Sequence, residues 1–88
     1  MSQPFHILVV DDDPQIGELI KDYLDQHGFR VSTALNGREM ERMMSRTQVD
    51  LIVLDLMLPG EDGLTLCRRL RETTDVLIIM LSAMGEEP

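Results

Sequence analysis

The chain has 88 residues, of which 43% are hydrophobic and 27% are charged, and this composition is typical of one small globular domain. Sixteen Asp and Glu against eight Lys and Arg give a formal net charge of -8, which argues against binding of nucleic acid or anionic membrane. A single Cys, Cys67, excludes an internal disulfide, and no apolar run approaches the roughly 18 residues of a membrane-spanning helix. We therefore expect a cytoplasmic domain.

Four short runs predict β-strands. Those at residues 7–10, 51–54 and 76–81 are continuously apolar, and at residues 7–10 this pattern is expected of a strand buried on both faces of a parallel sheet. The run at residues 29–34 alternates in polarity, which predicts an edge strand. His6 precedes the first run without a partner at metal-ligand spacing and is expected at the surface. Helical patterns separate the runs, so the chain predicts an α/β fold with a mainly parallel sheet.

Three helical patterns lie between these strands. Asp13 fits the N-cap of the first helix, with Pro14 at the first helical position and Gly28 as the C-terminal cap. Asn36-Gly37 predicts a turn before the second helix. The apolar stripes expected in the core are Ile16, Leu19, Ile20, Tyr23 and Leu24 on the first helix, Met40, Met43 and Met44 on the second, and Leu64, Cys67 and Leu70 on the third.

Acidic residues follow two of the apolar strands. Asp11 and Asp12 come directly after the first run, and Asp55 comes directly after residues 51–54. Because the carboxyl ends of parallel strands meet at one edge of the sheet, these carboxylates lie within several Å of each other if the two strands are neighbours. Two unit charges about 5 Å apart repel by roughly 3 kcal/mol at an effective dielectric constant of about 20. The pattern therefore predicts a divalent cation, and the oxygen ligands favour Mg²⁺.

The residues around Asp55 suggest phosphoryl chemistry. An Asp can act as the nucleophile in phosphoryl transfer, since that reaction requires mainly positioning and neutralisation of charge. The fourth run ends at Ser82-Ala83, and the Ser82 hydroxyl can hydrogen-bond an oxyanion placed on Asp55. Pro59 and Gly63 are expected to shape the loop beside Asp55.

Three motifs carry a resemblance to a known family. ILVVDDD at residues 7–13, LIVLDLMLPGEDGL at residues 51–64 and the pair Ser82-Ala83 occur in this order. Over roughly residues 6–87 the chain resembles the receiver domain of two-component response regulators, and most closely the OmpR-type transcription factors. The resemblance implies a flavodoxin-like, doubly wound parallel sheet with strand order 2-1-3-4, and Mg²⁺ as the cofactor.

The resemblance also implies roles for single residues. Asp55 would be the phosphoryl acceptor, Asp12 would bind Mg²⁺ directly and Asp11 would bind it mainly through water. Met57 would contribute its backbone carbonyl as a metal ligand, and Ser82 would supply the hydroxyl that moves onto the phosphoryl group. The implied function is a signalling switch that a sensor histidine kinase phosphorylates. Apart from its own phosphorylation and dephosphorylation, such a domain is not an enzyme.

The chain also departs from this family. A receiver has five βα units and a Lys after its fifth strand, whereas the only lysine here is Lys21, midway along the first helix. We therefore expect residues 1–88 to be the N-terminal part of a receiver, without the fifth βα unit and without the DNA-binding output domain. Little stable phosphorylation is expected of such a fragment. Its uncovered apolar face and the open edge at residues 76–81 predict self-association, and so a dimer.

Two other functions remain open at this point. Four apolar residues followed by Asp11-Asp12-Asp13 also fit the nucleophile motif of haloacid-dehalogenase-type phosphatases, with Asp11 as the nucleophile, although the Asp55 loop would then be unused. The chain could also be a structural or oligomerising fragment without activity. Substitution of Asp11 and Asp55 separates the first alternative from the receiver, and titration with Mg²⁺ separates the second.

Overall fold

The computed structural model describes residues 5–56, 58, 60 and 62–81. Its elements in chain order are β1 (His6–Val10), α1 (Pro14–Gln26), β2 (Arg30–Ala34), α2 (Gly37–Arg46), β3 (Leu51–Asp55), α3 (Gly63–Thr73) and β4 (Leu77–Leu81). All strand pairs are parallel, and the order across the sheet is β2-β1-β3-β4. The predicted α/β fold with strand order 2-1-3-4 is therefore confirmed. None of the helices in the described part of the chain has the length and apolar character needed to cross a membrane.

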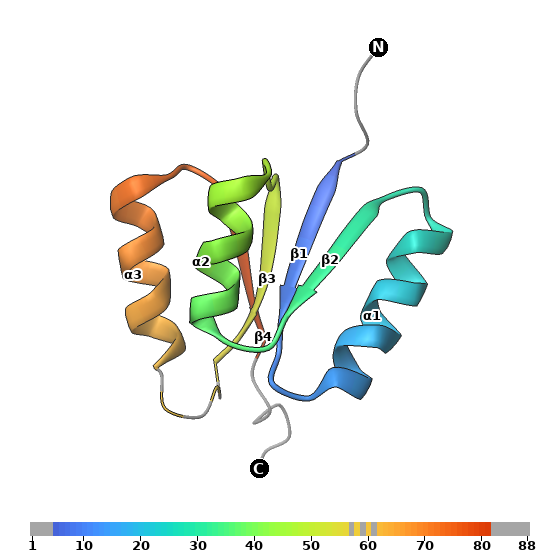
Figure 1. Cartoon of the computed structure of the whole chain (residues 1–88), viewed down its shortest axis with the longest axis horizontal. Coiled ribbons are helices and arrows are strands. Elements are labelled where there is room, and N and C mark those ends of the chain that lie inside the picture. The colour runs from blue at the N-terminus through green and yellow to red at the C-terminus, as the bar shows by residue number, and fades with distance from the viewer. Residues whose placement is uncertain (1–4, 57, 59, 61, 82–88) are drawn as a thin grey trace.

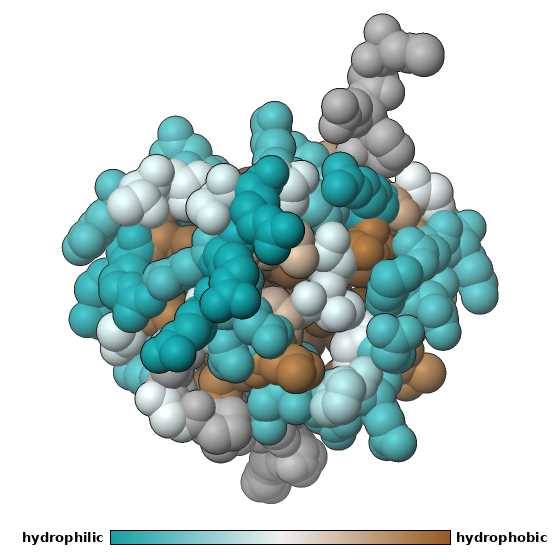
Figure 2. Space-filling view, in the orientation of Figure 1, coloured by the Kyte–Doolittle hydropathy of each residue, from teal (hydrophilic) through white to brown (hydrophobic). Residues whose placement is uncertain are grey.

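The helices cover the two faces of the sheet unequally. Figure 1 shows α2 and α3 on one face and α1 alone on the other. Along β1, Leu8 and Val10 enter the larger core cluster beneath α2 and α3, while Ile7 and Val9 enter the smaller one beneath α1. Because successive side chains of a strand point to opposite faces, both clusters require apolar residues, and the run at β1 is continuously apolar. Hydrophilic side chains cover the outward surface of α2 (Figure 2).

Side chains cap the start of each helix. Asp13 accepts a hydrogen bond from the Gln15 backbone N–H at 2.9 Å, as expected of the N-cap of α1. Asn36 accepts one from the Glu39 N–H at 2.9 Å, and the Glu39 carboxylate accepts one from the Leu35 N–H at 2.8 Å. The turn predicted at Asn36-Gly37 is therefore the beginning of α2 itself.

Two of the predicted apolar stripes are wrong in part. On α1, Ile20 and Leu24 pack against the sheet, but Leu19 is 71% exposed, and Ile16 and Tyr23 are also exposed. On α3, the structure buries Leu66 and Leu70, whereas Leu64, which the pattern assigned to the core, lies in solvent. A helix that packs on one neighbouring layer buries only a narrow stripe, and the spacing of apolar residues alone does not say which part of a wide stripe that is.

The expectation that His6 lies at the surface is also wrong. His6 is 2% exposed, and its ring lies 2.7 Å from the Gln48 carbonyl oxygen through Nδ1 and 2.8 Å from the Ser32 hydroxyl through Nε2. Its backbone N–H donates to the Asp50 carboxylate at 2.8 Å. A carbonyl only accepts hydrogen bonds, so Nδ1 carries a proton, and a neutral ring then accepts from Ser32 at Nε2. These partners come from β2 and from the segment before β3, which is why a local pattern does not reveal them.

This network gives a stability prediction. Ser32→Ala leaves Nε2 of the buried His6 ring without its partner, and we expect the free energy of unfolding to fall by about 1–3 kcal/mol. The matched control is Ser45→Ala, because the exposed Ser45 hydroxyl donates to the Arg42 carbonyl within its own helix, and its change should stay within about 0.5 kcal/mol. Urea unfolding followed by circular dichroism measures both values, and equal effects of the two substitutions would contradict the account.

Candidate metal centre

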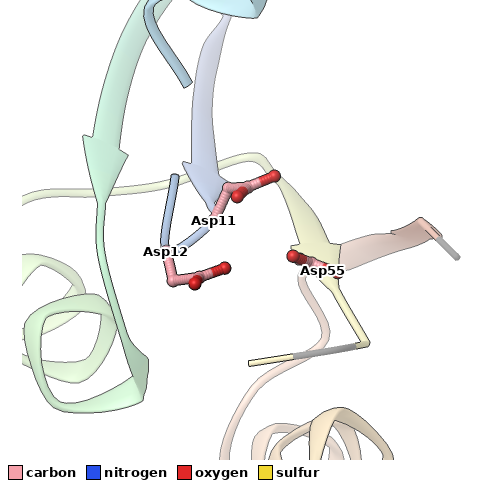
Figure 3. A group of neighbouring side chains, drawn as sticks. All are labelled: Asp11, Asp12 and Asp55. Carbon is pink, nitrogen blue, oxygen red and sulfur yellow. The ribbon is translucent and has the colours of Figure 1, made fainter. Parts of the chain in front are cut away.

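Three carboxylates meet at the carboxyl edge of the sheet. In the parallel pairing of β1 with β3, Val10 lies opposite Leu54, so the next residue of each chain segment, Asp11 and Asp55, falls at the same level. One carboxylate oxygen from each of Asp11, Asp12 and Asp55 lies within 4.8 Å of the others. In Figure 3 the side chains of Asp12 and Asp55 point toward each other from the ends of the two strands. The proximity expected from the two strand ends is therefore present.

Asp11 is the buried member of this cluster. It is 7% exposed, its backbone N–H donates to the Ala34 carbonyl at 3.0 Å, and its Oδ1 accepts from the Asp13 N–H at 2.8 Å. Burial raises the pKa of the Asp11 carboxyl above its ordinary value, the bond from Asp13 acts in the opposite direction, and the negative charges of Asp55 and Asp12 add to the rise. The ionised site is thus strained electrostatically in the absence of a cation.

Asp13 contributes more to the site than its capping role. The sequence assigns Asp13 only to the N-cap of α1, whereas its N–H also fixes the Asp11 carboxylate. A carboxylate that accepts from the backbone N–H two residues later forms an Asx-turn, and an Asp two residues before a helix N-cap is the sequence signal for it. The start of α1 therefore holds the side chain of Asp11 toward the cluster.

The donor set fits a hard divalent cation. All three residues offer carboxylate oxygens, which are the ligands that Mg²⁺ prefers. At a metal–oxygen distance of about 2.1 Å, two oxygens that bind the same Mg²⁺ directly are at most about 4.2 Å apart. The three carboxylate oxygens lie within 4.8 Å of one another, which fits a site where one carboxylate binds the cation through water. Lys21, the one lysine of the chain, does not compete for this cluster, because it pairs with Asp25 on α1 at 2.8 Å.

The backbone after Asp55 is held from two sides. Asp55 pairs with Leu81 in the β3–β4 ladder, and the Leu56 N–H donates to the Leu81 carbonyl at 3.0 Å. Gly63, the buried first residue of α3, lies against this same stretch of backbone. Of the other residues assigned to the site from the sequence, Met57, Pro59, Ser82 and Ala83 lie outside the described residues.

Comparison with known proteins agrees with this fold. The family model of the response regulator receiver domain matches residues 7–88. The chain belongs to this family, and the resemblance to OmpR-type receivers inferred from its motifs is confirmed.

Two curated relatives are regulators of transcription. Over 81 residues the chain is 44% identical to the transcriptional regulatory protein BaeR of Escherichia coli O6:H1, covering 92% of this chain and 34% of BaeR. Over 83 residues it is 43% identical to RpaA of Synechocystis, a DNA-binding dual master transcriptional regulator, covering 91% of this chain and 34% of RpaA. The chain thus spans about a third of the length of these relatives.

Solved structures of TrrA from Thermotoga maritima are also similar. TrrA in complex with Mg²⁺ and BeF superposes with a TM-score of 0.84 at 39% identity, over 92% of this chain and 71% of that one. TrrA in complex with the histidine kinase ThkA superposes with a TM-score of 0.85 at 38% identity, over 93% of this chain and 72% of that one. The four described strands therefore have the arrangement found in a receiver domain.

The repulsion at Asp11 predicts that one substitution has opposite effects on stability without and with Mg²⁺. Asp11→Asn keeps an oxygen for the Asp13 N–H but removes one of three crowded charges, so without Mg²⁺ we expect the free energy of unfolding to rise by about 1 kcal/mol. With millimolar Mg²⁺ the wild-type chain should gain stability and the variant should gain much less, since it has lost one of the three carboxylates of the cluster.

Urea unfolding in EDTA and in Mg²⁺ measures both effects. Asp75→Asn is the matched control, because Asp75 is an exposed carboxylate outside the cluster, and its free energy of unfolding should change by no more than about 0.5 kcal/mol in either buffer. A variant Asp11→Asn that is less stable than the wild type in EDTA would show that the three charges do not strain the site.

Proposed function

We propose that this domain is a phosphorylation-dependent signalling switch in which Asp55 accepts a phosphoryl group with Mg²⁺ bound beside it. The observation that carries the proposal is the meeting of the Asp55 carboxylate with those of Asp11 and Asp12 within 4.8 Å, at the edge where ligands of parallel sheets bind. Membership of the receiver family supports it. The added phosphoryl charge of about -1.5 to -2 then acts on the surrounding surface.

The proposed reaction places each carboxylate in a distinct role. A carboxylate oxygen of Asp55 attacks phosphorus and forms the new oxygen–phosphorus bond, while the bond from phosphorus to the donor breaks and its electron pair leaves with the donor. Asp12 would hold the cation directly and Asp11 mainly through water, and the Met57 carbonyl would be a further ligand. Mg²⁺ would supply charge neutralisation of the phosphoryl oxygens. Ser82 then contacts the phosphoryl group, and Ala83 follows it in the switch segment.

A sensor histidine kinase is the proposed donor. The similar protein TrrA was solved in complex with the histidine kinase ThkA. On the present chain, Ile16 and Leu19 are exposed apolar side chains one turn apart on α1, the helix that begins directly after Asp12 and Asp13. An apolar surface beside the acidic cluster suits a partner that must bring a phosphorylated side chain to Asp55. Small phosphodonors could serve the same reaction, and attack by water on the acyl phosphate would return Asp55 to its resting form.

The output of the switch is proposed from the relatives. BaeR and RpaA are transcriptional regulators, and RpaA is a DNA-binding one. We propose that residues 1–88 belong to the receiver domain of a cytoplasmic regulator whose DNA contacts come from a separate output domain. This assignment agrees with the net charge of -8, which does not favour DNA binding by these residues themselves.

The isolated 88-residue chain is also proposed to self-associate. Ile78 packs into the core beneath α2 and α3, so its neighbours in β4 face the other side of the sheet, where α1 covers β1 and β2. There Leu77 is 60% exposed and Ile79 is 50% exposed, and β4 is the last strand of the sheet within the described residues. Apolar side chains beside an open strand edge favour pairing with a second copy.

Light scattering after size-exclusion chromatography tests self-association. We expect the mass of a dimer at high concentration, and Ile79→Lys should raise the dissociation constant by at least about tenfold because it places a charge on the contact surface. Leu64→Lys is the control, since Leu64 is exposed on α3, which covers the opposite face of the sheet. A compact wild-type monomer at high concentration would contradict the proposal.

The phosphoacceptor assignment is tested by chemical trapping. The chain is incubated with acetyl phosphate and Mg²⁺, and any acyl phosphate is reduced with borohydride, which converts a phosphorylated Asp to homoserine even if the phosphoryl group is short-lived. Peptide mass spectrometry should locate the product at Asp55, and Asp55→Asn should abolish it. Asp12→Asn should reduce the yield at Asp55 by at least about tenfold through loss of the cation.

The controls separate this function from its alternatives. Asp75→Asn leaves the acidic cluster unchanged and should give the wild-type yield. Modification that survives Asp55→Asn but is lost with Asp11→Asn would favour a haloacid-dehalogenase-type nucleophile at Asp11. A chain that neither binds Mg²⁺ nor forms the product would favour a structural role.

A further inference from the structure

Gly63 approaches the backbone after Asp55 more closely than any residue with a side chain could. A Cβ placed on Gly63 would lie 2.7 Å from the Leu56 Cα, 2.9 Å from the Leu56 Cδ2 and 3.3 Å from the Asp55 carbonyl oxygen. Gly63 is also not among the described glycines with positive φ, which are Gly28 and Gly60. The first residue of α3 is therefore a glycine because of space and not because of backbone conformation.

We propose that Gly63 is a positioning residue for Asp55: its missing side chain lets the start of α3 fix the backbone that carries the phosphoacceptor. This inference rests on the proposed function, and it assigns to Gly63 an effect on the metal site rather than on the loop alone. The Asp55 carboxylate must stay within reach of those of Asp11 and Asp12, whose oxygens lie within 4.8 Å of its own.

The neighbours of Gly63 have little freedom to move. Leu56 is bound through its N–H to the Leu81 carbonyl at 3.0 Å, and Asp55 is paired with Leu81 in the sheet. On the other side, the Asp62 carboxylate caps α3 by accepting from the Leu64 N–H at 3.1 Å, and Leu66 anchors the first turn in the core. A new methyl group at position 63 must therefore displace either the start of α3 or the Asp55–Leu56 backbone.

The test is the affinity of the chain for Mg²⁺ after Gly63→Ala. The 15N-labelled protein is titrated with Mg²⁺, and the dissociation constant is taken from amide chemical shifts in NMR spectra. We expect Gly63→Ala to weaken binding by about tenfold or more, as for other substitutions that misplace metal ligands. An unchanged affinity in a folded variant would overturn the inference.

Gly17→Ala is the matched control. Gly17 is likewise a buried glycine in the first part of a helix, but its Cβ would meet the Thr33 side chain at 3.7 Å, which is an ordinary contact. This variant should keep the wild-type affinity for Mg²⁺. A general effect of Gly-to-Ala changes on the domain would instead weaken binding in both variants, and that result would contradict a positioning role.

A double substitution identifies the obstructing atom. Leu56→Ala removes the Cδ2 atom 2.9 Å from the new methyl group but leaves the Cα atom at 2.7 Å. Affinity for Mg²⁺ should therefore stay low in Leu56→Ala/Gly63→Ala, whereas full rescue would mean that only a side-chain clash was involved and that the backbone of Asp55 was never displaced.

The wild-type titration separates this inference from the function on which it depends. If the wild-type chain does not bind Mg²⁺, the proposed function fails; if it binds and Gly63→Ala binds equally well, only the positioning role fails. Should Gly63→Ala not fold, the wild-type spectra decide, because the Gly63 and Leu64 amides should shift together with those of Asp55 and Leu56. No shift at Gly63 and Leu64 would overturn the inference.

Discussion

The structure depends on the parallel register of β1 and β3. Pairing of Val10 with Leu54 places Asp11 and Asp55 at the same level of the sheet, and Asp12 joins them from the first turn beyond β1. A shift of this register by one residue would turn every side chain of β3 to the opposite face of the sheet, so that each would meet the wrong core cluster. The apolar core thus holds together three like charges that would separate in a free chain, and the resulting repulsion favours a cation in their midst.

The sequence predicts the strands and the acidic cluster because both follow from short-range patterns. Continuous apolar runs indicate strands buried on two faces, and an Asp directly after such a run must lie at the carboxyl edge of the sheet. It does not predict the burial of His6, whose ring partners Gln48 and Ser32 come from distant segments. The sequence does not predict the exposure of Leu19 and Leu64 either, since it depends on which elements each helix packs against.

The same distinction between short-range patterns and distant contacts applies to the residues of the site. The meeting of Asp11, Asp12 and Asp55 follows from topology, which the motifs imply. The hydrogen bond from the Asp13 N–H to Asp11 and the close approach of Gly63 to Leu56 depend on atomic distances that no residue pattern states. The assignments of Met57, Pro59, Ser82 and Ala83 concern residues outside the described part of the chain and stay predictions.

Binding of a paramagnetic cation tests the central claim most directly. Mn²⁺ takes the same oxygen ligands as Mg²⁺ and broadens the NMR signals of nearby amides. The account predicts that substoichiometric Mn²⁺ first broadens the amides of Asp11, Asp12, Asp55 and Leu56, and that excess Mg²⁺ restores them. Broadening spread evenly over the acidic surface, or centred on carboxylates elsewhere such as Asp50, would contradict a single cation site shared by the ends of β1 and β3.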